Sequence, residues 1–248
     1  MIIRKSRAEM AKMREAGRIV AETLKLLAEA IKPGISTEEL NRMAEGYIIK
    51  RGGKPAFKGY RGFPCSICTS VNEEVVHGIP GSRKLEAGDI VGIDVGVALR
   101  GYYGDAAETF PVGPVSPEVE HLISAAREVL SAGIERCRVG NRISDISHAI
   151  QARTEAAGYS VVREFVGHGI GRSMHEDPQI PNFGEAGRGP QLQPGMTFAI
   201  EPMITAGGYE VQVLEDGWSV VTKDRSLSAH FEHTVAVTED YPEILTVL

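Results

Sequence analysis

Apolar positions recur at helical spacing in the first fifty residues. Over residues 9–31 they lie three or four residues apart and end at Pro33-Gly34, which predicts a helix. Ser36, followed three residues later by Glu39, matches a capping box and begins a second predicted helix that ends near Gly52. Two consecutive helices are therefore expected before the first apolar strand.

The same arrangement returns after residue 115. Ser116-Pro117 begins a predicted helix that runs towards Gly133 or Gly140, and another helix is predicted over residues 144–158. Short runs rich in apolar and β-branched residues predict strands at 90–97, 161–166, 197–200 and 231–237. A pair of helices thus precedes a group of strands twice.

This recurrence indicates an internal duplication. Residues 85–94 align without gaps on residues 192–201, with matching Leu, Gly and Ile and a carboxylate as the last residue of both segments. Upstream, His77-Gly78-Ile79 recurs as His168-Gly169-Ile170. We expect one domain over residues 1–248, built from related halves at about 10–112 and 116–240, because no linker separates them.

Composition narrows the class of protein. The chain has 248 residues, and its 27 Lys and Arg against 33 Asp and Glu give −6 without a basic block, which argues against direct nucleic-acid binding. No apolar run approaches the ~18 residues of a membrane span, and the start lacks a signal-peptide pattern. The three cysteines make no disulfide framework, and the C-x-x-C at Cys65 and Cys68 lacks the second pair that structural zinc needs. We expect a soluble cytoplasmic protein that binds no membrane.

Two acids occupy matching places in the halves. Alternation in residues 90–97 puts the valines and isoleucine on one face and Asp94 on the other, between Gly92 and Gly96. An unpaired carboxylate inside an apolar strand is costly. One such acid could reach water or pair with an arginine, but Glu201 at the equivalent repeat position favours a shared role.

Each half offers a second acid. Asp105 lies eleven residues after Asp94, in a turn that returns into another strand, and Glu232 lies 31 residues after Glu201. If the halves pack around a pseudo-two-fold axis, four carboxylates converge and need cations to balance them. Two divalent ions roughly 3.5–4 Å apart are a recurring hydrolytic arrangement. His168, between two glycines, suits a further metal ligand.

The remaining histidines and the tryptophan have weaker signals. His175 lies seven residues after His168 in a predicted loop, and His77 is the first-half counterpart of His168. Trp218 is either a partly buried aromatic residue or the lid of an apolar pocket. A structural interpretation, with no role in chemistry, is preferred for His121, His148, His230 and His233.

Taken together, these residues resemble the methionine aminopeptidases of the short bacterial type over nearly the whole chain. The resemblance rests on residues 77–80, 92–96, 105, 167–172, 175–176, 199–202 and 231–234. It implies an α+β architecture, the pseudo-symmetric pita-bread (creatinase/aminopeptidase) fold that arises from an internal duplication. In that fold a curved antiparallel sheet carries helices on its outer face.

The resemblance also implies a dinuclear site. Its metal ligands are Asp94, Asp105, His168, Glu201 and Glu232, of which Asp105 and Glu232 bridge the two ions. Mixed carboxylate and imidazole ligation does not distinguish Co, Mn, Fe and Zn. Water activated by the ions attacks the first peptide bond, with Glu201 as general acid and base. His175 stabilises the oxyanion, and His77 lies near the scissile nitrogen.

Substrate recognition follows from the same resemblance. The pocket for the methionine side chain includes Tyr60, Phe63, Cys68 and Trp218, together with His77 and His175. Asn72 and Ser228 match positions that hold a monovalent cation in some members. Phe63 and Met174 depart from the common residues, which leaves the second-residue preference open. The implied activity removes N-terminal methionine from nascent proteins and peptides whose second residue is small, by a monomer with transient ribosome contact.

Three alternatives remain. A proline-specific aminopeptidase or creatinase-like hydrolase shares the metal strands but usually carries an extra N-terminal domain, for which Asp94 lies too near the start of the chain. A binding or scaffold module that has lost its metal would lack some ligands, and all five are present here. A structural metal protein would not need His77 and His175, which are not required as ligands.

Overall fold

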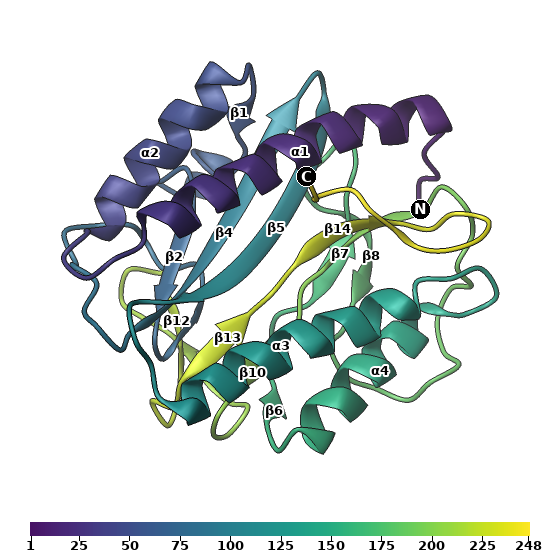
Figure 1. Cartoon of the computed structure of the whole chain (residues 1–248). Coiled ribbons are helices and arrows are strands. Elements are labelled where there is room, and N and C mark those ends of the chain that lie inside the picture. The colour runs from purple at the N-terminus through teal and green to yellow at the C-terminus, as the bar shows by residue number, and fades with distance from the viewer.

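Four helices in two pairs frame the molecule. The computed structural model describes all 248 residues, and its helices are α1 (Arg7–Ala30), α2 (Thr37–Lys50), α3 (Pro117–Glu135) and α4 (Ile143–Ala156). In Figure 1, α1 and α3 cross in front of the strands, with α2 and α4 beside them. All four helices predicted from periodicity are present, so the doubled arrangement of helix pairs is confirmed.

The helix starts follow from local chemistry. Ser36 caps α2 by accepting from the backbone N–H of Glu39, whose side chain accepts from the Ser36 N–H in return. Ser6 and Glu9 form the same capping box at the start of α1. Each box satisfies two backbone donors that the first helical turn leaves free. Ser116 caps α3, and Pro117 occupies the first turn, where no N–H is needed.

Fifteen strands pair antiparallel in four sheets. The first sheet contains β1 (Lys54–Pro55), β2 (Cys68–Val71), β4 (Ile90–Leu99) and β5 (Tyr102–Pro111). The largest contains β7 (Gly167–Gly169), β8 (Glu176–Ile180), β9 (Thr197–Ile200), β14 (His233–Ala236) and β15 (Glu243–Ile244). The two three-stranded sheets contain β3 (Glu74–Val76), β11 (Val211–Val213) and β12 (Val220–Thr222), and β6 (Ser160–Val161), β10 (Met203–Thr205) and β13 (Ser228–His230).

The strand predictions had mixed outcomes. Residues 197–200 are β9 as predicted, and residues 90–97 belong to the longer β4. The prediction for 161–166 is wrong beyond Val161, because the chain bends at Arg163-Glu164 after the Val162 N–H reaches the carbonyl of Met203. The prediction for 231–237 holds only over β14.

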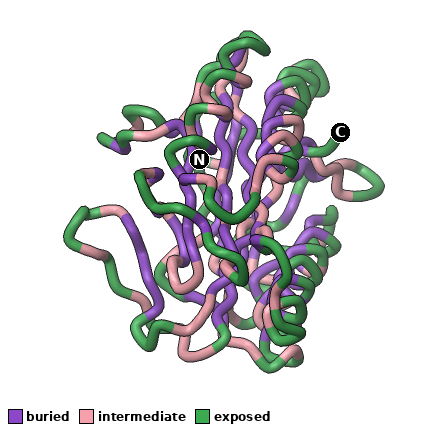
Figure 2. The backbone as a smooth tube through the Cα atoms, turned by 60° about the vertical axis from the view of Figure 1, so that its left-hand side comes forward, coloured by how far each residue is buried: buried purple, intermediate pink, exposed green.

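Each helix pair covers its own apolar core. Val91, Ile93, Val95 and Val97 of β4 are buried in one cluster with residues of α1 and α2, which confirms the alternation expected from sequence. Phe198 and Ile200 of β9 belong to a second cluster with residues of α3 and α4. Figure 2 shows buried strands in the middle of the molecule and exposed outer faces on the helices. The opposite faces of β4 and β9 are left to build a site between the halves.

Helix α1 approaches the strands so closely that one position accepts no side chain. A Cβ at Gly17 would collide with the carbonyl of Leu245, and Gly104 of β5 lies against the Gly17 backbone. We expect Gly17→Ala to lower the free energy of unfolding by about 1–3 kcal/mol, because overpacking forces backbone shifts. The control is Gly46→Ala at an exposed position of α2 with open space around it, which should raise stability by about 0.5–1 kcal/mol. Urea unfolding of both variants checks the opposite signs.

Candidate active site

The first two acids come from one hairpin. β4 and β5 pair antiparallel, and Gly96 of β4 lies opposite Asp105 of β5. Asp94 is on β4, two residues before Gly96. A side chain at Gly96 would collide with Phe57 and Met174, so the glycine leaves room for a pocket beside the acids. The two carboxylates therefore lie on one face of the hairpin, as the alternation predicts.

The third acid arrives from the other half of the chain. The Asp105 N–H donates to Thr234 Oγ1 at 2.9 Å, and that hydroxyl donates back to the Asp105 carbonyl at 2.8 Å. The Glu232 N–H donates to the Ala107 carbonyl at 2.9 Å. These contacts join residues 232–234 to β5 across the two halves. They place the side chain of Glu232 next to that of Asp105.

His168 and Glu201 complete the group of expected ligands. His168 on β7 pairs with Ala199 of β9, and Glu201 follows directly after β9. The His168 Nδ1 lies 2.9 Å from the Gly169 carbonyl oxygen, an acceptor, so Nδ1 carries the hydrogen. The lone pair is then on Nε2, which lies 3.4 Å from Glu201 Oε1. This tautomer suits a metal ligand.

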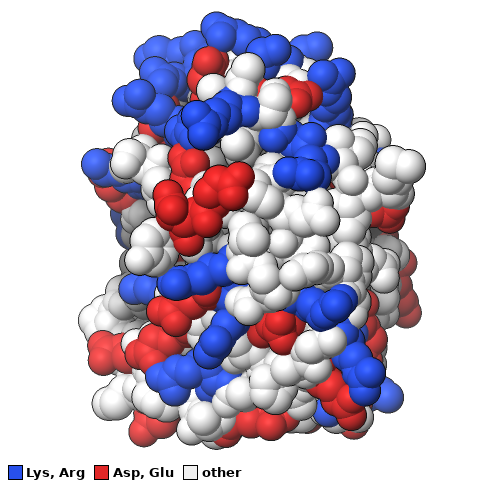
Figure 3. All heavy atoms as spheres, turned by 90° about the vertical axis from the view of Figure 1, so that its right-hand side faces the viewer, with Lys and Arg blue, Asp and Glu red and all other residues white.

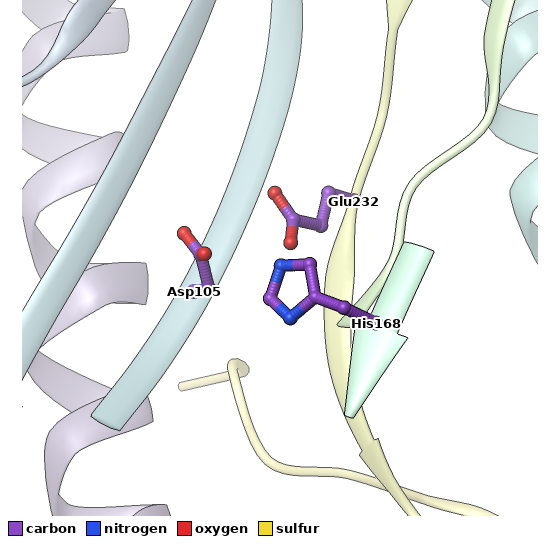
Figure 4. Close-up of side chains that lie close together, drawn as sticks. All are labelled: Asp105, His168 and Glu232. Carbon is purple, nitrogen blue, oxygen red and sulfur yellow. The ribbon is translucent and has the colours of Figure 1, made fainter. Parts of the chain in front are cut away.

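Three of the five side chains lie close enough together to hold a metal ion. Asp105, His168 and Glu232 each offer a ligand atom, and these atoms lie within 4.8 Å of one another. Figure 4 shows the three side chains pointing toward one another: Asp105 from β5, His168 from β7, and Glu232 from the segment before β14. Asp94 Oδ1, Asp105 Oδ1 and Glu232 Oε1 are buried and make no hydrogen bond. Such unpartnered carboxylate oxygens are costly unless a cation coordinates them.

Electrostatics points the same way. Burial raises the pKa of Asp94 to about 7. Burial, reinforced by the neighbouring carboxylates, raises the pKa of Asp105 and of Glu232 well above the ordinary range. Burial and the charge of Asp94 do the same to the pKa of Glu201. Ionising all four acids together is therefore unfavourable without a cation beside them, and a metal that binds there would displace the protons that they hold.

Two further histidines border the acids. The His175 ring lies 4.1 Å from that of His168, and its Nδ1 lies 2.9 Å from the Tyr60 hydroxyl. Burial, followed by the neighbouring His168, Arg61 and His77, lowers the pKa of His175 to about 3. His77 lies edge-on to Phe165 and to Trp218, with ring centroids 5.5 and 6.3 Å apart, and burial lowers its pKa. Both imidazoles are neutral at neutral pH.

One pocket joins the acids, the histidines and the aromatic residues. All eleven site residues predicted from sequence line it: Tyr60, Phe63, Cys68, His77, Asp94, Asp105, His168, His175, Glu201, Trp218 and Glu232. Met174, which the sequence comparison placed near the pocket, also lines it, and so do Phe57 and Arg61, which were not predicted. Gly59 and Gly62, on either side of Tyr60-Arg61, were the sequence signal for this part of the pocket wall. All three cysteines are free, and Cys68 is a buried wall residue, as predicted.

One histidine lies closer to the acids than its sequence context predicts. His230 on β13 is buried, and its Nε2 has no hydrogen-bond partner and lies 4.0 Å from Glu201 Oε2. The sequence favours a purely structural role for it. Its only sequence signal was its place two residues before Glu232. The His230 imidazole thus lies beside Oε2, the Glu201 carboxylate oxygen other than the one nearest His168.

The outer surface carries mixed charge. Figure 3 shows Lys and Arg gathered at the upper end of one face, with both signs interspersed below. None of the helices combines the length and the apolar character needed to cross a membrane.

Known proteins resemble the chain along its whole length. The model of metallopeptidase family M24 matches residues 11–239. The methionine aminopeptidase of Clostridium perfringens is 56% identical over 248 residues, 100% of each chain, and methionine aminopeptidase 1 of Bacillus subtilis is 55% identical over 246 residues, 99% of each.

Solved structures match the fold as well. The crystal structure of methionine aminopeptidase from Rickettsia prowazekii superposes with a TM-score of 0.98 at 46% identity, covering 100% of both chains. Prolidase from Pyrococcus furiosus shares only the fold, with a TM-score of 0.81 at 22% identity over 99% of this chain and 66% of its own. These likenesses confirm the pita-bread architecture. The chain belongs to metallopeptidase family M24, among its methionine aminopeptidases.

Proposed function

We propose that the pocket removes N-terminal methionine from peptides and nascent proteins whose second residue is small, with two divalent metal ions. The observation that carries this proposal is the meeting of five ligand side chains and two neutral histidines in one pocket with apolar walls. Asp94 and Asp105 would hold one ion, and His168 and Glu201 the other. Asp105 and Glu232 would contact both. When bound, the ions supply an activated water and polarise the scissile carbonyl.

Glu201 handles protons in this proposal. Its Oε1 faces His168, and burial together with Asp94 raises its pKa, so the carboxylate readily accepts a proton. It would take the proton from the attacking water and pass it to the departing amine. His77 lies across the same pocket and would accept a hydrogen bond from that amine or donate one to it.

His175 supplies a neutral hydrogen-bond donor. Because burial keeps its pKa low, the imidazole carries one hydrogen, on either Nδ1 or Nε2. If the Tyr60 hydroxyl donates to Nδ1, the hydrogen is on Nε2, where it can donate to the carbonyl oxygen of the substrate. That oxygen gains negative charge during attack, so the donor stabilises the transition state more than the substrate.

The apolar end of the pocket suits a methionine side chain. Phe63 and Trp218 lie edge to face, with ring centroids 5.1 Å apart, and Cys68 and Met174 pack in the same cluster. A flexible thioether makes favourable contacts with aromatic edges and sulfur atoms. The same wall would exclude charged side chains, because burying them unpaired is costly.

The proposal also covers a monovalent cation, the origin of the two halves, the oligomeric state and the place where the protein works. The proposal includes a monovalent cation near Asn72 and Ser228, which are neighbours because the Ser228 N–H donates to the Asn72 carbonyl at 3.0 Å. An origin of residues 10–112 and 116–240 by duplication is supported by the helix pair in each half. We expect a monomer that meets its substrates in the cytoplasm, in transient contact with the ribosome.

Methionine release from the tripeptide Met-Ala-Ser tests the proposal. Metal-depleted protein should release no methionine, and titration with Mn(II) or Co(II) should restore release. Parallel assays with Met-Leu-Ser and with a peptide whose second residue is proline separate the competing functions. Release from the proline peptide alone would support a proline-specific aminopeptidase. If no methionine is released from any of the peptides, although calorimetry shows that the protein binds metal, the result would support a binding or scaffold module.

A further inference from the structure

The chain's first residues reach the loop that carries His175. The Lys5 N–H donates to the Gly195 carbonyl at 2.6 Å, just before α1 begins. The Lys5 side chain is only 3% exposed, and its Nζ lies 2.5 Å from Glu176 Oε2, whose side chain is 7% exposed. A third contact, from Nζ to the Ile3 carbonyl at 3.1 Å, helps to satisfy the buried ammonium group. The N-terminal segment before α1 thus places a buried cation against Glu176, the residue that follows His175.

Glu176 in turn closes that loop. Its Oε1 accepts the backbone N–H of Arg172 at 2.7 Å and that of Ser173 at 3.2 Å. Residues 172–176 are therefore held as one turn, with Met174 and His175 at its centre and facing the pocket. A side chain at Gly171 would collide with both Lys5 and Glu176, so the glycine lets the buried pair form.

Other contacts hold the ends of this loop or lie at the surface, and at its far end Glu176 begins β8, which pairs with Gly169 of β7. Arg172 Nη2 lies 3.0 Å from Glu9 Oε1, but the arginine side chain is 69% exposed, and exposed pairs contribute little. The Tyr103 N–H donates to the Gly171 carbonyl at 2.9 Å, which anchors only the start of the loop. His175 itself makes one side-chain hydrogen bond, to Tyr60. Of the two ion pairs to this loop, Lys5–Glu176 is the one in which both side chains are buried.

We infer that Lys5 is a positioning residue for His175, acting through its buried ion pair with Glu176. A buried ion pair often adds no net stability over an apolar pair of the same shape, but it demands one geometry. Here that geometry fixes the turn that aims the imidazole into the pocket. Because displacement of about 1 Å can cost roughly 100-fold in rate, a loosened turn weakens catalysis without loss of any group that touches substrate. This inference rests on the proposed function.

The test combines Lys5→Met with His175→Ala in Mn(II)-loaded enzyme acting on Met-Ala-Ser. In the wild-type background Lys5→Met should lower kcat at least about tenfold while KM changes less than about threefold. In the His175→Ala background it should change kcat less than about twofold, because the group it positions is gone. The matched control is Arg14→Met on α1, which removes the exposed pair with Glu243 of β15 and should leave kcat unchanged.

Hydrogen exchange provides a readout that needs no activity. Lys5→Met should speed exchange of the Arg172 and Ser173 amides, and Arg14→Met should not. Faster exchange in a protein that cleaves none of the test peptides would refute the proposed function but not the ionic tie. The inference about Lys5 is overturned by unchanged exchange, or by equal losses of kcat in both backgrounds, which would mark a purely structural residue.

A double variant covers the case in which Lys5→Met does not fold. Lys5→Met/Glu176→Gln removes both charges and keeps an oxygen that accepts the two loop amides. It should recover folded stability and still show low kcat, because the tie to residue 5 is absent. Wild-type kcat in this double variant would overturn the inference.

Discussion

Glu201→Gln lowers kcat on Met-Ala-Ser by at least about a thousandfold at saturating Mn(II). The substitution keeps the size of the side chain and removes its ability to hold a proton in the buried site. It also weakens one metal contact beside His168, where Glu201 Oε1 lies 3.4 Å from Nε2. A positioned acid and base contributes about 10²–10⁴-fold, and loss of a charged ligand adds to that. Stopped assays of released methionine measure the change.

The control for this prediction changes the same charge elsewhere. Glu164→Gln alters an exposed carboxylate four residues before His168 and should leave kcat within about twofold. Calorimetry on Glu201→Gln then separates loss of metal from loss of proton transfer. A variant that binds both ions and retains kcat would remove Glu201 from the chemistry, leaving it only a structural neighbour of the site.

Mn(II) binds metal-free protein at least about tenfold more tightly near pH 7.5 than near pH 5.5. Because burial raises the pKa of Asp94 to about 7, this carboxyl is protonated at the lower pH and must lose its proton before it binds a metal. The pKa values of Asp105, Glu201 and Glu232 are also raised, so each adds to the same dependence. Burial lowers the pKa of His168, so protonation of this imidazole competes less with metal binding than it would in a free histidine. Titration calorimetry in buffers of different ionisation enthalpy counts the released protons.

The sign for stability follows from the same shifts. A carboxyl whose folded pKa is raised favours the folded state at low pH, and that contribution is lost as pH rises from the unfolded pKa through the folded one. For Asp94 this window runs from 3.8 to about 7. His175, His230 and His233 have pKa values lowered to about 3, 3 and 4, so their contribution is lost as pH falls below about 6.5.

The buried acids and the buried histidines change stability with pH in opposite directions, so the Tm of the metal-free protein does not isolate the metal site. The rise in Tm on adding metal does. Mn(II) should raise Tm more near pH 7.5 than near pH 5.5, because binding stabilises only as far as the site is deprotonated. Asp94→Asn removes one titrating ligand and should flatten the dependence, whereas Glu164→Gln should preserve it. An equal rise in Tm at both pH values would mean that the buried acids do not bind the ion.

Local patterns were sufficient for much of the architecture. Ser36 and Glu39 mark the start of α2 because capping is settled within one turn of helix. The alternation around Asp94 predicted which face of β4 enters the core, since a strand turns every second side chain to the same side. The bend at Arg163-Glu164 escaped prediction, because Val162 is apolar and only its pairing with Met203 marks where the strand ends.

The site residues were found by a repeat and a family resemblance, both of which are read along the chain. Asp94 and Glu201 occupy matching places in 85–94 and 192–201, so the sequence by itself determined which acids are candidates. Their spacing could not predict that Arg61 lines the pocket or that His230 lies beside Glu201. Those side chains enter from strands and turns that the apolar pattern leaves ambiguous.

Only the tertiary structure decided which groups meet. Asp105 and Glu232 become neighbours because residues 232–234 exchange hydrogen bonds with β5, and Lys5 meets Glu176 across 171 residues of chain. Helix caps and strand faces are local properties, set by neighbours a few residues away. Contacts between distant segments depend on how whole layers pack, and a single sequence carries no local signal of that packing. The sequence therefore determined the helices, the core faces and the candidate ligands, and packing assembled them into one pocket.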